Sequence, residues 1–368
     1  MATTDFSTLS AANKVVQTTL VMKAGRDSSL VMSSGMIGKA DDANRPIQLI
    51  TELNATDRGA SAVIHLIQDL LGDGIVDDQI LEGSEERMNN ESLTIQLSML
   101  RHAVKNQGEM SEQKTVLRFR QHVREKLGHW WGRMNDELAF MTLAGISYTL
   151  NLDGSARAGS NLSQLAFSAD VTAPSTNRKL YAGVATSTAT ISTTDTMSWN
   201  YLVEARAFAE RRRIKPLRMN GVDRYIVLMS PEQMRDLKLD DDYKTIAANG
   251  ANRGEKNPLF TGMAADVDGL LLYSHNRVPT TRGTAATGKY GASGTVEGAQ
   301  ALFLGAQAMG YARIGEAKWN ESDNKDYGNR YGVSYGQIFG MRKSIFNSIP
   351  DGLTLEDFGV MSLYSAAA

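Results

Sequence analysis

The feature that most constrains this sequence is a helical pattern of unusual length, from Ser111 to Ala144. At 1.5 Å per residue these 34 residues predict a rod of about 50 Å, too long for the core of a compact small domain. Ser111 can cap the first turn and Gly145 can end the last one. The apolar residues recur with a mean step of about 3.6 residues, the α-helical period; they are Val116, Phe119, Val123, Leu127, Trp130, Met134, Leu138 and Met141.

Two glycines, Gly128 and Gly132, lie one turn apart inside this pattern. Each costs a helix about 1 kcal/mol relative to alanine. One interpretation is close packing against another backbone, or a mild bend. The other is a hinge in a helix that must change its curvature.

An acidic connection precedes the helix. Residues 47–53 and Leu93–Met99 alternate apolar and polar positions and predict strands, whereas Ala62–Leu71 fits a strand or a helix. Gly72–Glu91 joins Ala62–Leu71 to Leu93–Met99. These 20 residues are too many for an ordinary hairpin turn, so they are disordered or functional. They contain one base, Arg87, and seven acids, namely Asp73, Asp77, Asp78, Glu82, Glu85, Glu86 and Glu91.

The rest of the chain indicates an α+β fold without a regular βαβ repeat. Residues 1–46 are polar and predict an extended arm, and residues 153–198 predict loops and short strands. A helix is expected from Asp195 to Arg213, followed by strands at Val222–Met229, Leu270–Tyr273 and Ala301–Leu304. Ser230, Pro231 and Gln233 have the order of a helix cap, a first helical residue and a capping-box partner.

The last predicted strand, which begins at Tyr331, has two unequal faces. One face carries large side chains, and the other carries Gly332, Ser334, Gly336, Ile338 and Gly340. A face with so few side chains admits close approach of another backbone. We expect the long helix to occupy it.

Composition excludes several classes of protein. The chain has no cysteine, which rules out disulfides, thiolate nucleophiles and cysteine-bound metals. Its formal net charge of −2 lacks the strongly basic balance of a protein that binds nucleic acid over its whole surface. No signal peptide and no run of about 18 apolar residues is present, so we expect a cytoplasmic product. We expect no cofactor and no metal.

One motif nevertheless suggests an enzyme. Residues Gly283–Lys289 match the first seven positions of a phosphate-binding loop, but Tyr290 replaces the hydroxyl residue that would hold magnesium, and no helical pattern follows. A surface loop is the simpler interpretation, and a phosphate-ligand enzyme is the alternative. The acidic clusters lack the spacing of a calcium loop.

Charge is distributed in blocks along the chain. The segment Gly72–Glu91 has a net charge of −6, residues 101–126 have +4, and residues 206–218 have +5. Such blocks allow the acidic segment of one copy to meet a basic segment of the next. The candidate acidic interface comprises Asp73, Asp77, Asp78, Glu82, Glu85 and Glu86, and the candidate basic partner comprises Arg118, Arg120 and Arg124.

An ordered series of motifs resembles the major capsid proteins of podovirus-type tailed bacteriophages, over roughly residues 45–368. The series is PIQLITEL, LLGDGIVDDQILEGSEE, QLSMLRHAVKNQGEMSEQ, LYAGVATST, YIVLMSPEQMRDLK, RGEKNPLFTG and DYGNRYGVSYGQIFGMRKSIFN followed by DFGV. The resemblance implies the α+β capsid fold of the Hong Kong 97 phage type, with an N-terminal arm, an extended loop, a spine helix, a peripheral domain and an axial domain.

The resemblance also implies a division of the chain. The arm is residues 1–44, the extended loop with its strands 45–110, the spine helix 111–145, a connecting segment 146–194, the axial domain 195–318, and the return strands of the peripheral domain 319–368. In this family the spine helix can bend in the immature shell, which would give Gly128 and Gly132 a hinge role.

The function implied is structural and not enzymatic. Copies of the chain would form hexamers and pentamers of an icosahedral shell around double-stranded DNA. The founding member of this fold crosslinks its subunits, but no residue here matches that chemistry, and we expect noncovalent assembly. The implied partners are other copies, a portal protein and scaffold or cementing proteins, with the packaged DNA bound weakly and without sequence preference. The implied location is the virion capsid, after assembly in the host bacterial cytoplasm.

Overall fold

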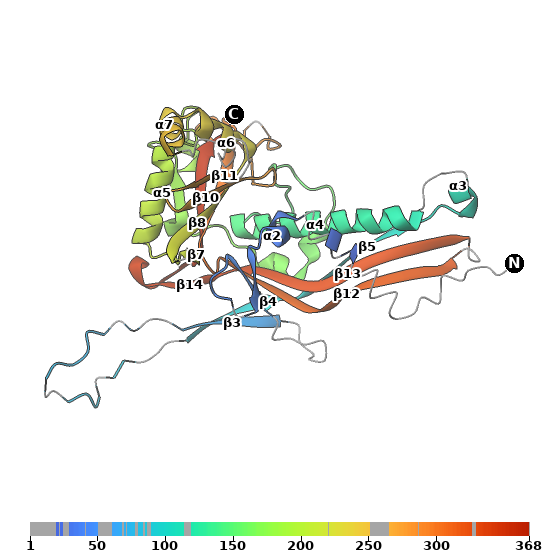
Figure 1. The fold of residues 1–368 in the computed structure, drawn as a ribbon, viewed down its shortest axis with the longest axis horizontal. Coiled ribbons are helices and arrows are strands. Elements are labelled where there is room, and N and C mark those ends of the chain that lie inside the picture. The colour runs from blue at the N-terminus through green and yellow to red at the C-terminus, as the bar shows by residue number, and fades with distance from the viewer. Residues whose placement is uncertain are drawn as a thin grey trace.

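The fold is given by a computed structural model (Figure 1), which describes residues 20–21, 23–24, 29–40, 42–50, 61–67, 70, 72–77, 80–83, 85–86, 90–113, 119–219, 221–250, 265–285, 287–325 and 329–367. The molecule is elongated and α+β. A region that carries the C-terminus lies at one end, a long pair of strands runs beneath a helix toward the other end, and a loop extends away from the body (Figure 1).

A five-stranded sheet runs along the molecule in the order β1-β2-β12-β13-β5. β13 is antiparallel to both β12 and β5, whereas β2 is parallel to both β1 and β12. The strands are β1 Ile37–Ala40, β2 Ile47–Ile50, β5 Ser98–Lys105, β12 Met309–Lys325 and β13 Arg330–Lys343.

Helix α4 (Phe119–Ala144) packs on the face of this sheet that carries the large side chains. The Trp131 ring stands edge-on to Tyr335 and Phe339 of β13, with ring centroids 5.5 and 5.4 Å apart. The expectation that the helix would occupy the glycine face is therefore wrong. Aromatic rings bury more apolar area against a helix than a bare backbone does, and this favours the observed side.

The predicted helix Ser111–Ala144 is correct at its C-terminal end and wrong at its N-terminal end. Gly145 has a φ of 70° and Ile146 N–H donates to the Met141 carbonyl at 2.9 Å, as in a Schellman cap. At the other end, residues Glu109–Gln113 form a separate helix, α3, so Ser111 lies inside a helix and does not cap one. Residues 114–118 are outside the described part of the chain. With 26 residues, α4 is about 39 Å long.

Around Gly340, the glycine face of the sheet is covered by an antiparallel hairpin, β3 (Ser61–Ile67) and β4 (Asn90–Gln96). A Cβ placed on Gly340 would lie 2.2 Å from the carbonyl oxygen of Gln96, so β4 approaches β13 as closely as only a glycine allows. An apolar cluster fills the space around this contact; it contains Ile50, Ala62, Ile64, Leu93, Ile95, Ala312 and Phe346. The predicted strand Leu93–Met99 is divided, because β4 ends at Gln96 and β5 begins at Ser98.

A seven-stranded sheet forms the core of the region at the C-terminal end. Its order is β6-β16-β11-β8-β10-β9, and β7 pairs with β8. The predicted strand Val222–Met229 is β8, and Ser230 and Gln233 form the predicted capping box of α6. The other strands are β6 Lys179–Tyr181, β7 Leu217–Met219, β9 Ala265–Val267, β10 Leu270–Ser274, β11 Gly298–Leu304 and β16 Val360–Ala366, and the helices are α5 Trp199–Arg211, α6 Pro231–Leu239 and α7 Asp241–Gly250.

The two sheets exchange segments late in the chain. β12 starts at Met309 and already belongs to the five-stranded sheet, whereas β16 pairs with β11 and returns the last residues to the seven-stranded sheet. The expected boundary between the axial domain and the return strands, at residues 318/319, therefore falls inside β12 and does not separate the two sheets. The connecting residues form short 3₁₀ turns and a hairpin, η2 Leu162–Gln164, η3 Ala166–Asp170, η4 Thr176–Arg178, η5 Thr188–Thr190, β14 Ile345–Ser348, η7 Ile349–Asp351 and β15 Thr354–Asp357.

The N-terminal segment is attached to α4 through one buried acid, Asp136. Its carboxylate accepts hydrogen bonds from the Ser29 hydroxyl at 2.5 Å, from Leu30 N–H at 2.8 Å and from Val31 N–H at 3.1 Å. These donors precede or begin the short helix α2 (Leu30–Ser33), whose free N–H groups attract an anion. These hydrogen bonds hold residues 29–31 against helix α4, before β1 begins.

Candidate functional site

The loop between β3 and β4 carries most of the predicted acidic residues away from the body of the molecule (Figure 1). Asp73, Asp77, Glu82, Glu85 and Glu86 are all exposed. The last predicted acid, Asp78, lies outside the described residues.

Two carboxylates of the loop also shape its backbone. Glu86 accepts a hydrogen bond from Gly72 N–H at 2.7 Å, and Glu85 accepts one from Gly83 N–H at 2.8 Å. Gly74 and Gly83 have φ values of 77° and 92°, which glycine adopts without strain. These contacts leave most of each carboxylate facing solvent.

The base of the loop is fixed to the body through Glu91 on β4. Its two oxygens accept hydrogen bonds from Asn347 of β14, from the backbone N–H at 3.0 Å and from Nδ2 at 2.5 Å. Arg342 of β13 donates to the Thr94 carbonyl. Glu91 is one of the seven acids predicted between the strands, but it holds the base of the loop to β14 within the same chain.

The loop also exposes four large apolar side chains, which the sequence reasoning did not single out. Leu70, Val76, Ile80 and Leu81 are 64, 65, 78 and 62% exposed. Apolar side chains gathered on a projecting, otherwise acidic loop indicate contact with another molecule. The signal was present in the sequence as the apolar letters of LLGDGIVDDQIL, residues 70–81.

The described part of α4 that carries two of the candidate basic residues does not lie near this loop. Arg124 is half-buried in α4, the side chain of Arg120 in the same helix is not described, and Arg118 lies outside the described residues. The first turns of α4 and the loop extend toward opposite ends of the molecule (Figure 1). Pairing between them can therefore occur only between two copies.

The basic block 206–218 is largely used within the chain. Arg206 bonds to Glu210 at 2.9 Å and to Asp268 at 2.6 Å, and Arg212 pairs with the buried Asp351. Arg218 bonds to Asp223 at 3.2 Å. This block is therefore a weaker candidate for the partner of an acidic loop.

Gly128 and Gly132 are both buried in the interior of α4, on the part of the helix that packs against the five-stranded sheet. The hairpin β3–β4 lies on the opposite face of that sheet. The hinge role of Gly128 and Gly132 stays a prediction.

The segment Gly283–Lys289 does not have the structure of a phosphate-binding loop. Lys289 Nζ pairs with Glu297 at 2.6 Å, and Tyr290 forms a β-bridge with Val296, so turns follow the lysine where a phosphate loop would continue into a helix. Within the described ranges no cluster of His, Asp and Glu could hold a metal, and no helix is long and apolar enough to cross a membrane.

Comparison with known proteins identifies the family. The phage capsid protein family matches residues 6–368. The major capsid protein of Pseudomonas phage KPP25 is 40% identical over 372 residues, which cover 99% of this chain and 98% of that protein. The chain belongs to the phage capsid protein family. Its function is that of a phage major capsid protein, and no comparison supports the enzyme alternative.

Solved capsid structures confirm the fold. The capsid of Ralstonia phage GP4 superposes with a TM-score of 0.76 at 30% identity, covering 92% of this chain and 91% of that one. The capsid of cyanophage Pam1 gives a TM-score of 0.71 at 16% identity, covering 91% and 92%. The Hong Kong 97 phage-type fold expected from the resemblance is therefore correct. Capsid proteins associate with copies of themselves in a virion shell, and this chain shares that function.

Proposed function

We propose that this capsid protein builds hexamers and pentamers of an icosahedral shell around double-stranded DNA, and that the projecting loop makes the main contact between neighbouring copies. The observation that carries the proposal is the loop itself, which exposes apolar side chains and carboxylates together, far from its own body. Within one copy the four apolar side chains remain in water, whereas on a neighbour each would contribute about 1.5–3 kcal/mol when fully buried.

The acidic residues give this contact its orientation. Asp73, Asp77, Asp78, Glu82, Glu85 and Glu86 would face Arg118, Arg120 and Arg124 at the start of the spine helix of the next copy. Charge complementarity of this kind sets register and association rate more than affinity. The proposed assembly is noncovalent and relies on packing and charge.

The remaining roles follow the same division. The five-stranded sheet and α4 would form the peripheral domain, and the seven-stranded sheet with α5 to α7 would form the axial domain. Gly128 and Gly132 would let α4 change curvature between shell states. Partners would include a portal protein and scaffold or cementing proteins, with weak contact to DNA, and assembly would take place in the host bacterial cytoplasm. No catalytic role is assigned.

A charge exchange tests the loop. The variant Glu85→Lys with Glu86→Lys should fold normally but give few shells in negative-stain images and light scattering. Adding Arg118→Glu and Arg120→Glu to the same chain should restore assembly, because the signs are then complementary again. Glu204→Lys, an exposed change on α5, is the surface control and should assemble. Normal shells from the first variant would refute charge pairing.

A further inference from the structure

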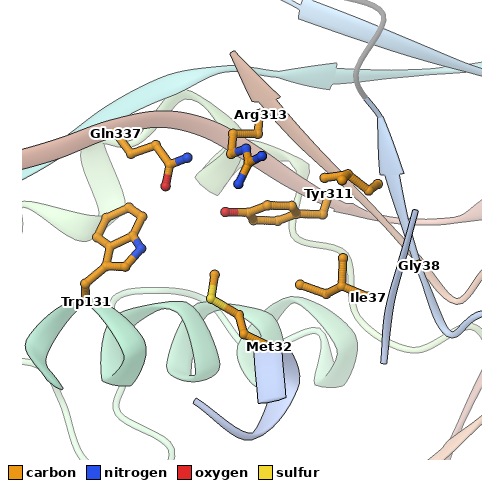
Figure 2. Close-up of a pocket in the computed structure, with 8 residues that line it drawn as sticks. Met32, Ile37, Gly38, Trp131, Tyr311, Arg313 and Gln337 are labelled. Atoms are coloured by element: carbon orange, nitrogen blue, oxygen red, sulfur yellow. The ribbon is translucent and has the colours of Figure 1, made fainter. Parts of the chain in front are cut away.

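A cavity of about 270 Å³ lies between the N-terminal segment, α4 and the five-stranded sheet (Figure 2). The N-terminal segment closes one side with Met32, Ile37 and Gly38, and α4 contributes Trp131. The sheet supplies Leu49 and three polar side chains, Tyr311, Arg313 and Gln337. Figure 2 shows these polar groups directed into the same space from β12 and β13.

Two hydrogen-bond donors in this cavity lack an acceptor. Gln337 is 2% exposed, and its Nε2 has no hydrogen-bond partner among the described residues. Arg313 lines the same cavity (Figure 2), is half-buried, and forms no hydrogen bond or ion pair within the described part of the chain. A buried donor such as the Gln337 amide costs about 1–3 kcal/mol when it has no acceptor, so a native site normally supplies one.

The third polar group is also suited to an acceptor. Burial raises the pKa of Tyr311 to about 12, so its hydroxyl stays protonated at neutral pH. Its hydrogen bond to Asn135 Oδ1 is long, at 3.5 Å. The hydroxyl can therefore donate to a better acceptor in the cavity.

We propose that this cavity binds an oxyanion, a carboxylate or a phosphate group. A guanidinium fork binds two oxygens of one anion, and the Gln337 amide and the Tyr311 hydroxyl complete the coordination. None of the eight lining residues is acidic. No residue of the lining pairs with the charge of Arg313, and Trp131 and Met32 limit the ligand to a small group.

The oxyanion has two possible sources. One source is a carboxylate from the acidic loop of another copy, and this version of the proposal rests on the proposed function. The other source is free phosphate, and this version is independent of the proposed function. The loop of the same copy points away from the cavity (Figure 1). Titration of the unassembled full-length protein with sodium phosphate and, separately, with a peptide of residues 72–86, at constant ionic strength set with chloride, distinguishes them.

Binding is measured by Trp fluorescence, because Trp131 lines the cavity, and by the melting temperature. Saturable binding of phosphate, of the peptide or of both supports the proposal, and competition between them places both in one site. Arg313→Gln should weaken binding at least tenfold, and Gln337→Met should weaken it in the same direction. Lys318→Gln, an exposed change of the same charge on β12, should alter it less than twofold.

Absence of saturable binding, or equal binding by wild type and Arg313→Gln, would mean that the cavity holds water only and would overturn the proposal. If Arg313→Gln fails to fold, Gln337→Met alone decides. Normal shells from a protein that binds neither probe would refute this site and leave the proposed capsid function intact.

Discussion

The close contact between strand β4 of the hairpin and strand β13 of the sheet requires a glycine at position 340, and this requirement can be measured. Gly340→Ala would place a methyl group 2.2 Å from the carbonyl oxygen of Gln96 and 3.0 Å from Ile95 Cγ2. Ordinary contact begins near 3.4 Å, so β4 must retreat by about 1 Å. The neighbour is backbone inside a sheet hairpin, and Ile95 is fully buried, so neither can rotate aside.

The expected cost lies at the upper end of the range for overpacking, about 2–3 kcal/mol. The same strand offers two graded controls. A Cβ on Gly336 would lie 2.7 Å from Arg101 Cβ, and one on Gly332 would lie 3.7 Å from the Val104 carbonyl oxygen. Gly336→Ala should cost less than Gly340→Ala. Gly332→Ala should be neutral or stabilising by up to about 1 kcal/mol, because alanine restricts the unfolded chain.

Urea unfolding of the unassembled subunit gives the three free energies of unfolding, and hydrogen exchange of residues 90–96 reports on β4 directly. The predicted order of stability is Gly332→Ala above Gly336→Ala above Gly340→Ala. Equal stability of the Gly332 and Gly340 variants, with unchanged exchange on β4, would refute the close approach of the hairpin to the sheet.

Three further predictions concern the arm, the acid response and the helix. Asp136→Asn should expose the N-terminal segment to protease and cost about 1.5–3 kcal/mol, because hydrogen bonds to a buried charge are lost; unchanged proteolysis would contradict this. Burial raises the pKa of Glu356, but hydrogen bonds, including those from Asn177 and Thr354, and the charge of Arg178 outweigh it and leave the pKa below its ordinary 4.5. The unfolded chain then binds more protons than the folded chain, so the stability decreases as the pH is lowered below about 4.5. In thermal melts, the melting temperature of Glu356→Gln should decrease less over this pH range. Gly128→Ala with Gly132→Ala should stiffen α4 and block shell expansion in electron micrographs; normal expansion would limit these glycines to packing.

Local signals in the sequence predicted local structure well. The capping box Ser230–Gln233 and the strand Val222–Met229 were correct because each depends on neighbours within a few residues. The C-terminal end of α4 followed from Gly145 for the same reason. The predicted start of that helix was wrong because apolar periodicity does not separate α3, which ends at Gln113, from α4, which begins at Phe119.

Nonlocal contacts were the main failures. The alternation along β13 showed that one face is nearly bare, but not which element covers it, and the hairpin β3–β4 comes from more than 200 residues away in the sequence. The pairing of β16 with β11 likewise leaves no trace in either strand. At the candidate site, the charge pattern predicted the acidic residues of the loop. The sequence did not show that the apolar residues among them are exposed, because exposure depends on the fold.

In the proposed shell, the projecting loop joins one copy to the next. A cryo-EM reconstruction of particles assembled from the full-length chain tests it most directly. We predict an icosahedral shell in which residues 70–86 lie on an adjacent subunit, with Val76, Ile80 and Leu81 buried and the carboxylates facing Arg118, Arg120 and Arg124 of that subunit. A shell in which this loop lies in solvent or folds back on its own subunit would contradict the account.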